Sequence, residues 1–471
     1  MRAALALCFA LAIATAQARE IPATVRAALA KAKVPLDAVS ILVEPVEAAP
    51  PALVHRISVE MNPASVMKLV TTAAALDLLG PAFTFHTDVL HTGELANGVL
   101  AGDLVLRGGG DPKLTYERLW QLAHQLRSRG LREIRGDVIV DRGYFATVPH
   151  DPASFDNQPR RAYNVAADAM LVNFQAITFH FVPAADGVRV VPEPDLPNVE
   201  VASRVKASPA ACGAWRSDLR YEVQTNGMLA SIFFNGSFPV ACGERDWPLV
   251  VLDSAAFTES MWRWVWSEAG GVMRGSFRSG RTPKEAVLLY RADSEPLASL
   301  VRDMNKYSNN VMARHLFLAL SAERTGQGSA QESARIVAGW LRERGIVAPE
   351  LVLENGSGLS RNERVSAATL AAILRGAWSS PTMPELVASL PVLSVDGTFK
   401  TRRAAGAGGH AHLKGGTLDG VQSMAGYVID RENRRWIAVM IVNHANANAA
   451  QPALDALAEW VYREAGQGGA R

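Results

Sequence analysis

The character of the sequence changes twice along the chain, and this change constrains the fold more than any other feature. Residues 62–79 predict an apolar, buried helix with Asn62 as its cap and Gly80-Pro81 as its stop. From about Phe83 to Leu252 the pattern consists of short β-type runs separated by Gly, Pro and Asp. Beyond about Ala255 longer helical patterns return. The sequence therefore predicts one domain of helices packed on an antiparallel sheet, interrupted by a β-rich insertion.

The domain boundaries follow from the same pattern. The 471 residues are enough for two or three domains. We expect 19–82 and 255–471 to form one split α+β domain, and 83–254 to form the insertion, as two nested modules. The last two strand patterns, 424–429 and 436–442, predict an antiparallel hairpin before the final helix.

The N-terminus has the pattern of a signal peptide. Arg2 precedes an apolar run over residues 3–16, and Ala16-Gln17-Ala18 offers small residues for cleavage. The alternative is a membrane anchor, but a run of about 14 residues is shorter than the ~20 that span a bilayer. We expect residues 1–18 to be removed, leaving an exported chain without a membrane span.

Removal of the leader leaves two cysteines, Cys212 and Cys242. In an oxidising compartment an even number of cysteines tends to pair, so we predict one disulfide. Closing this loop would stabilise the fold by roughly 3 to 4 kcal/mol in the chain-entropy model. Two buried free thiols are the alternative.

Charge and histidine spacing exclude other classes of partner. The formal net charge is +2 and no basic tract stands out, which argues against nucleic-acid binding. His410 and His412 have no third ligand at a suitable spacing, so we expect no metal and no cofactor.

Ser65 and Lys68 form the first candidate catalytic element, three residues apart near the start of the predicted helix. This spacing places both side chains on one helix face. A serine hydroxyl needs a nearby base to become a nucleophile, and a buried lysine serves once desolvation and nearby cations lower its pKa. The spacing alone is a weak signal, since about one or two such pairs occur by chance in a chain this long. The alternative is a surface lysine that is simply solvated.

Two further segments carry side chains suited to the same chemistry. In 307–310, Ser308 offers a proton relay and Asn310 an amide for a peptide, although taken alone this segment is better explained as a helix cap. Segment 412–418 predicts an edge strand that pairs with an extended peptide, with a glycine-rich turn as the alternative. There Lys414 supplies a cation, Gly416 permits close approach, and Thr417 offers a hydroxyl and an N–H group.

In combination the three elements are far more specific than any one of them. With them, the chain resembles the class C low-molecular-mass penicillin-binding proteins, the D-alanyl-D-alanine carboxypeptidase/endopeptidase family S13. The resemblance covers nearly all of the mature chain. Further matching stretches are 108–112, 163–164, 171–174, 355–361 and 395–398.

The resemblance implies a serine β-lactamase/transpeptidase-like fold and an acyl-enzyme on Ser65, with Lys68 as its base. Ser308, Asn310 and Lys414 would complete the catalytic set, Gly416 and Thr417 would bind substrate, and the N–H groups of Ser65 and Thr417 would line the oxyanion hole. It also implies peptidoglycan stem peptides as substrates, β-lactams as inhibitors and a periplasmic location.

One departure from the family pattern leaves alternatives open. Gly415 stands where the family usually has a threonine. If that side chain points away from the cleft, activity survives; if it contacts substrate or supports Lys414, turnover falls. A catalytically weak peptidoglycan-binding protein is therefore the first alternative, and a secreted β-lactamase or esterase is the second.

Overall fold

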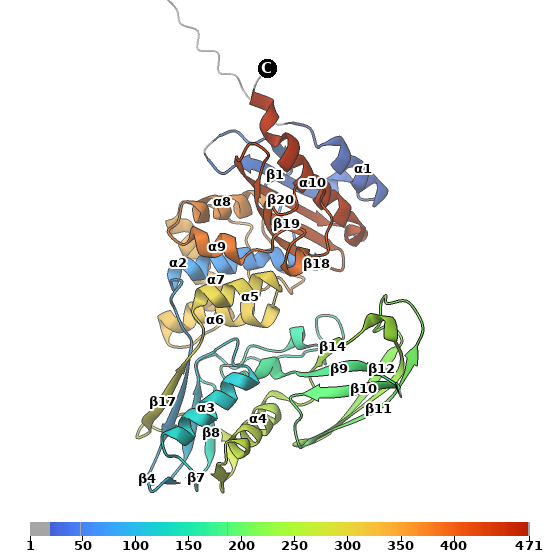
Figure 1. Ribbon diagram of the computed structural model, residues 1–471. Coiled ribbons are helices and arrows are strands. Elements are labelled where there is room, and N and C mark those ends of the chain that lie inside the picture. The colour runs from blue at the N-terminus through green and yellow to red at the C-terminus, as the bar shows by residue number, and fades with distance from the viewer. Residues whose placement is uncertain (1–18, 48, 186, 470–471) are drawn as a thin grey trace, which may run out of the picture.

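A computed structural model describes residues 19–47, 49–185 and 187–469 (Figure 1). The predicted signal peptide, 1–18, lies outside the described residues. Within the described part of the chain, no helix combines the length and the apolar character needed to cross a membrane. Figure 1 shows a head, which contains both ends of the described chain, and an elongated insertion beneath it.

The head is built on a five-stranded antiparallel sheet in the order β18-β19-β20-β1-β2. The predicted terminal hairpin is confirmed, because β19 pairs with β20 along its whole length. β18 lies at the sheet edge, as predicted for segment 412–418. The strands are β1 (Val39–Pro45), β2 (Leu53–His55), β18 (Ala411–Leu418), β19 (Val421–Ile429) and β20 (Arg435–Asn443).

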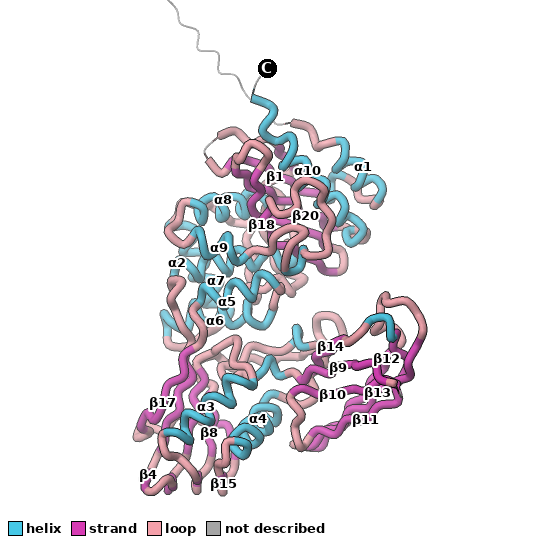
Figure 2. The backbone as a smooth tube through the Cα atoms, viewed as in Figure 1, coloured by secondary structure: helices cyan, strands magenta, loops and turns pink. Residues whose placement is uncertain are grey.

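Helices cover both faces of this sheet (Figure 2). One face packs against α1 (Ala23–Lys31) and α10 (Gln451–Glu464) in a core that includes Phe399, Met424 and Leu457. The other face packs against a helical layer with its own core around α2 (Lys68–Leu78). The other helices of this layer are α5 (Leu297–Lys306), α6 (Asn310–Thr325), α7 (Ala330–Glu343), α8 (Ala367–Trp378) and α9 (Met383–Ser389). The predicted α+β class is therefore confirmed.

The first module of the insertion holds two mixed sheets, ordered β16-β8-β6-β3-β17 and β15-β7-β5-β4, with two helices. The helices α3 (Tyr116–Ser128) and α4 (Ser254–Glu268) share one apolar core with these strands. The strands are β3 (His86–His91), β4 (Glu94–Ala96), β5 (Val99–Ala101), β6 (Leu104–Gly108), β7 (Glu133–Ile134), β8 (Val138–Asp141), β15 (Val272–Met273), β16 (Phe277–Ser279) and β17 (Val287–Asp293).

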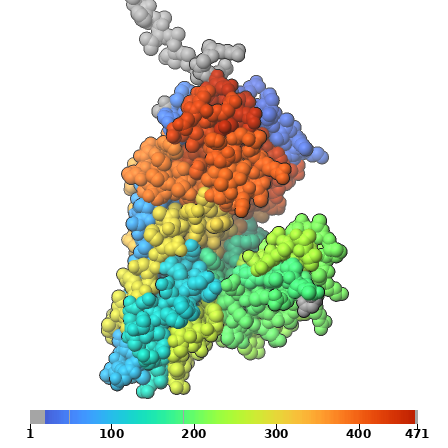
Figure 3. Space-filling view, viewed as in Figure 1, coloured from blue at the N-terminus to red at the C-terminus, as the bar shows by residue number. Residues whose placement is uncertain are grey.

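The second module consists of two three-stranded sheets, β10-β9-β14 and β11-β13-β12, around an aromatic core. Cys212 and Cys242 form a disulfide in this module, as predicted. The surface is hollowed between this module and the head (Figure 3). The strands are β9 (Ile177–Ala184), β10 (Gly187–Glu193), β11 (Val199–Ser208), β12 (Leu219–Asn226), β13 (Leu229–Pro239) and β14 (Arg245–Leu249).

The insertion extends further along the chain than the sequence pattern indicated. We expected the head to resume at residue 255, but α4 packs in the core of the insertion. β16 then pairs with β8, and β17 pairs with β3. Because these three elements complete sheets and a core begun before residue 142, the head resumes only after Asp293.

Candidate active site

Ser65 lies in a tight turn that leads into α2. The predicted helix over 62–79 instead begins as a 3₁₀ turn at Ala64–Met67, and the α-helix starts at Lys68. Asn62 acts near the predicted cap position, since its Oδ1 accepts a hydrogen bond from Ala64 N at 2.8 Å. Ala64 has a φ of 46°, in the left-handed region that non-glycine residues rarely adopt. Such strained backbone is found at sites where a reactive side chain must be presented.

Lys68 is fully buried, and its Nζ contacts three parts of the head. Lys68 Nζ donates to Ser65 Oγ at 3.0 Å, to Asn310 Oδ1 at 2.6 Å and to the Ser357 carbonyl at 2.5 Å. The structure therefore brings Asn310 to the Ser65–Lys68 pair, although it lies 242 positions beyond Lys68 in the sequence. The Ser65–Lys68 distance lies within the reach of a direct proton transfer.

The surroundings of Lys68 favour its neutral form. Burial lowers its pKa well below that of an ordinary lysine, and the charges of Lys414 and Arg314 lower it further. Glu363 acts in the opposite direction. A lysine with a lowered pKa accepts a proton at neutral pH, which a general base requires.

The second predicted element supplies both a helix cap and a site residue. α5 ends at Lys306, Ser308 has a φ of 56°, and α6 begins at Asn310. Asn309 caps α6, because its side chain accepts from Met312 N at 3.0 Å. The capping role thus belongs to Asn309, and Ser308 and Asn310 remain free to face the two lysines.

Lys414 connects the third element to the second. It is fully buried in β18, and its Nζ donates to Ser308 Oγ at 2.8 Å and to the Gly415 carbonyl at 2.7 Å. Burial lowers the pKa of Lys414 to about 7. Ser308 can therefore exchange a proton with Lys414 or with a group bound in the site.

The two glycines of β18 face opposite sides of the strand. A β-carbon at Gly416 would lie 2.6 Å from the Pro63 carbonyl and 2.9 Å from Ser65 N, so only glycine allows β18 to approach the nucleophile this closely. A β-carbon at Gly415 would lie 3.0 Å from the Phe399 ring, in the core beneath the sheet. The missing threonine side chain therefore belongs to the face opposite Ser65.

Thr417 is exposed at the edge of the sheet. Its hydroxyl contacts Gln422 Oε1 at 3.1 Å. The predicted contact of this hydroxyl with a substrate carboxylate stays a prediction, since the side chain is engaged within the strand pair β18–β19.

Glu363 is a residue of the site that the sequence reasoning missed. It is fully buried, and its Oε1 accepts hydrogen bonds from three successive amides at 354–356, while Oε2 accepts from Gly358 N at 2.8 Å. These bonds fix the loop whose Ser357 carbonyl binds Lys68. The sequence shows the glycine-rich run 355–361, but a single glutamate after such a run does not by itself predict a site residue.

A cavity of about 440 Å³ lies where the insertion meets the loop that Glu363 fixes. From the insertion it is lined by residues that include His150, Asp151 and Phe155, and from the head by Arg314 and Arg361. Phe155 and Leu359 also pack against a small apolar cluster of Ala64, Leu418 and Val421, and Ala64 is the neighbour of Ser65 in the sequence. The cavity offers both apolar and charged walls to a ligand. Its lining includes none of Ser65, Lys68, Asn310 and Lys414, so it lies on the other side of the loop 355–361 from the catalytic side chains.

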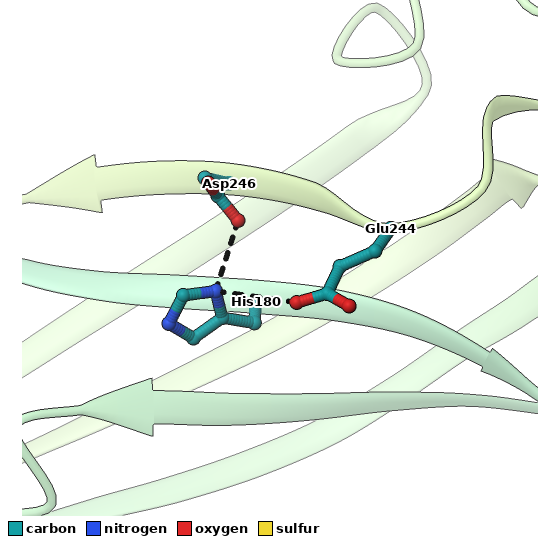
Figure 4. A group of neighbouring side chains, drawn as sticks. All are labelled: His180, Glu244 and Asp246. Carbon is teal, nitrogen blue, oxygen red and sulfur yellow. Dashed lines mark hydrogen bonds and ion pairs between the residues drawn. The ribbon is translucent and has the colours of Figure 1, made fainter.

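One group of side chains outside this site has the composition of a metal site. Among the described residues, His180, Glu244 and Asp246 place their ligand atoms within 4.8 Å of one another (Figure 4). Both nitrogens of His180 are engaged, Nδ1 with Asp246 at 2.9 Å and Nε2 with Glu193 at 2.8 Å. Burial lowers the pKa of His180, but the hydrogen bonds to Asp246 and Glu193 raise it by more. The group is an ion-pair cluster at the surface of the second module.

Comparison with known proteins decides the family. Residues 21–464 match the model of the D-Ala-D-Ala carboxypeptidase 3 (S13) family. The chain belongs to this family. It is a low-molecular-mass penicillin-binding protein of the D-Ala-D-Ala carboxypeptidase group of serine peptidases, as the sequence resemblance indicated.

The similarity of this S13 member to known relatives extends over most of its length. It is 29% identical over 423 residues to a D-alanyl-D-alanine carboxypeptidase of Actinomadura sp. (strain R39), covering 86% of this chain and 78% of that protein. It is 27% identical over 408 residues to D-alanyl-D-alanine carboxypeptidase DacB of Haemophilus influenzae, covering 81% and 80%.

Solved structures share the fold. Penicillin binding protein 4 (dacB) from Haemophilus influenzae superposes with a TM-score of 0.76 at 23% identity, covering 93% of this chain and 99% of that one. The same protein complexed with a β-lactam gives a TM-score of 0.73 at 22% identity, again over 93% and 99%. The S13 member described here thus has the penicillin binding protein 4 fold over its insertion as well as its head.

Proposed function

We propose that this S13 member is a periplasmic D-alanyl-D-alanine carboxypeptidase and endopeptidase that cleaves peptidoglycan stem peptides through an acyl-enzyme on Ser65. The observation that carries the proposal is the 3.0 Å contact between Ser65 Oγ and the buried Lys68 Nζ, together with the 2.6 Å contact between Lys68 Nζ and Asn310 Oδ1. The predicted signal peptide and the disulfide support a periplasmic location.

Acylation starts with neutral Lys68. Its Nζ takes the proton of Ser65 as Oγ attacks the carbonyl carbon of the penultimate D-alanine, forming a tetrahedral oxyanion. The N–H groups of Ser65 and Thr417 are the proposed donors to this oxyanion, and the close approach of β18 at Gly416 supports their meeting on one atom.

Collapse of the intermediate requires a proton for the leaving amine. Ser308, bonded to Lys414 at 2.8 Å, donates that proton and recovers one from Lys414. The C–N bond breaks, D-alanine or a cross-linked strand departs, and the acyl group remains on Ser65. Exchange with solvent then removes the proton that Lys68 took from Ser65 and returns one to Lys414. Water attacks the ester as neutral Lys68 takes its proton, and this proton passes to Ser65 Oγ when the acyl group leaves, which restores the free serine.

The edge strand and the cavity provide the binding surface for the peptide. The first residues of β18 pair with segment 391–393 through Ala411 and Leu413. Beyond Leu413, no strand of the described part of the chain covers the outer edge of β18, and an extended stem peptide can add a strand there. The cavity of about 440 Å³ behind the loop 355–361 has room for a further part of that peptide. A β-lactam has the same reactive amide, and therefore acylates Ser65 in place of the substrate.

The first alternative, a catalytically weak peptidoglycan-binding protein, depended on Gly415. Because residue 415 faces the core at Phe399 and Lys414 keeps its contact with Ser308, the geometry favours the enzyme.

A fluorescent penicillin tests the proposal. We expect stable labelling of the wild type at one equivalent, no labelling of Ser65→Ala, and release of D-alanine from a pentapeptide by the wild type only. Absence of labelling in a folded wild type would favour the weak binder, and rapid loss of the label would favour a β-lactamase.

A further inference from the structure

Three arginines lie close together at one end of the second module. From this end the chain continues to Asn164, which lines the cavity. Arg160 and Arg161 precede the 3₁₀ turn at Ala162–Asn164, and Arg216 lies in the loop between β11 and β12. All three are half-buried. Within 19–47, 49–185 and 187–469, none of them forms an ion pair with a carboxylate.

Aromatic rings hold two of these guanidinium groups in place. Arg161 lies 5.7 Å from the centre of the Trp247 ring, and Arg216 lies 4.7 Å from that of Trp215 and 5.5 Å from that of Trp247. A guanidinium stacked by its face keeps the N–H donors of its edge for a planar anion.

The hydrogen bonds of the three groups leave donors to spare. Arg160 Nη1 donates to the Val251 carbonyl at 3.0 Å, and Arg216 Nη2 donates to the Asp246 carbonyl at 2.9 Å. Arg161 Nε and Arg216 Nε are buried without a partner in the described part of the protein. Burial, and then the charge of Arg161, lower the pKa of Arg216. Cations brought together without a counter-charge repel one another, and a bound anion removes that repulsion.

This arginine cluster, Arg160, Arg161 and Arg216, adjoins the candidate active site. The Arg160 carbonyl accepts from Val250 N at 2.9 Å, directly after β14. Val250 belongs to the same buried apolar cluster as Val311, the neighbour of Asn310 at the start of α6. In the other direction along the chain, Asn164 lines the cavity between the insertion and the loop 355–361. Figure 1 draws β14 on the side of the second module that faces the head.

We propose that the arginine cluster binds carboxylate groups of the peptidoglycan strand whose stem peptide is held at Ser65. The identity of the polymer rests on the proposed function. The chemistry of binding rests on the three arginines alone. Carboxylates match the paired donors of a guanidinium edge, and they recur along every stem peptide. The second module thereby holds the polymer while the head cleaves it.

Co-sedimentation with purified sacculi tests this site without turnover if all proteins carry Ser65→Ala. The double variant Arg161→Gln/Arg216→Gln is compared with Arg204→Gln, an exposed arginine of the same module that lies 5.7 Å from the Phe233 ring. We expect the double variant to bind sacculi about tenfold more weakly, the effect of losing one charged hydrogen-bonded contact. Arg204→Gln should bind as Ser65→Ala does. Equal binding by the double variant would overturn the proposal.

Sacculi whose carboxylates have been converted to amides test the same point without a change in the protein. Their binding should fall as far as the double substitution reduces it, and undiminished binding would overturn the proposal even if the double variant fails to fold. Inorganic phosphate tests whether the cluster is instead a site for a free anion. The assignment to peptidoglycan is wrong if phosphate raises the melting temperature of the protein with intact arginines but not of the double variant, while sacculi bind these two proteins equally. Penicillin labelling of protein with Ser65 intact reports separately on the proposed function.

Discussion

Lys68 is the residue on which the proposed chemistry depends most directly. Its Nζ contacts the nucleophile, the asparagine and a loop carbonyl, and the 3.0 Å distance to Ser65 Oγ is that of a direct hydrogen bond. A base must lose its proton before it can accept another. The lowered pKa of Lys68 therefore matters as much as its position.

Replacing Lys68 with arginine should abolish acylation while keeping the positive charge. The guanidinium group does not deprotonate in proteins, so it cannot take the proton of Ser65. We expect the rate of labelling by fluorescent penicillin to fall by about 10² to 10⁴, the usual contribution of a general base. Lys284→Arg, at an exposed position of the insertion, is the matched control. A Lys68→Arg protein that acylates at the wild-type rate would show that another group is the base.

Glu363 acts on Lys68 through both geometry and charge. Burial raises the pKa of Glu363, whereas four amide donors favour its ionised form. Since both oxygens only accept hydrogen bonds, the geometry holds a carboxylate. Its charge raises the pKa of Lys68, against the larger lowering by burial and by Lys414.

Glu363→Gln should shift the pH dependence of acylation. Without the negative charge the pKa of Lys68 falls further, so the acid limb of the acylation rate, which rises as Lys68 loses its proton, moves to lower pH. The glutamine NH₂ group would also oppose Gly358 N–H, displace the loop and reduce the maximal rate by about tenfold to a hundredfold. Rates measured from pH 5 to 9 separate the two effects. Glu363→Asp keeps the charge and should lose rate without this shift; an unmoved acid limb in Glu363→Gln would contradict the electrostatic role.

At the scale of single elements, the two faces of β18 have different surroundings: one faces the catalytic residues and the other faces the core. Lys414 and Gly416 face the nucleophile, and Gly415 between them faces Phe399. Alternation of side chains along a strand produces this division. The departure from the family pattern at Gly415 therefore falls on the face where chemistry is not carried out.

The pair Gly415→Ala and Gly416→Ala tests this division with the same added methyl group. At residue 416 the new carbon would lie 2.6 Å from the Pro63 carbonyl, so either β18 or the Ser65 turn must move, and acylation should fall by about a hundredfold. At residue 415 the new carbon would lie 3.0 Å from the ring edge of Phe399. There we expect acylation within about twofold of wild type and a loss of at most about 1–3 kcal/mol of unfolding free energy from crowding. Penicillin labelling and thermal unfolding measure the two effects, and equal losses of acylation would contradict the assignment of faces.

Local patterns predicted the elements better than their connections. The apolar helix after Ser65, the edge strand at Lys414 and the terminal hairpin each have a periodicity or a turn signal within a few residues. The end of the insertion has none, because α4, β16 and β17 join partners that lie far back in the chain. The left-handed turn at Ala64 was also invisible, since nothing in the residue type signals a φ of 46°.

At the scale of the whole molecule, the head and the insertion have separate cores. The head packs around α2 on one face of its sheet and around α10 on the other. The insertion has one continuous core, which extends from α3 and α4 into the aromatic interior of the second module. The disulfide lies within that module and makes no connection to the head.

Removing the disulfide should therefore destabilise the insertion before it affects Ser65. The double variant Cys212→Ser/Cys242→Ser frees a loop of sequence separation 30, which lowers stability by about 3 to 4 kcal/mol in the chain-entropy model. Trp215 and Trp247 lie in this module, and their fluorescence should change at a lower temperature than in the wild type. Penicillin labelling, which reports on the head, should persist through that first transition because the cores around α2 and α10 stay packed. If labelling and tryptophan fluorescence are lost at one temperature in the variant, the head depends on the insertion for its fold and the two behave as a single cooperative unit.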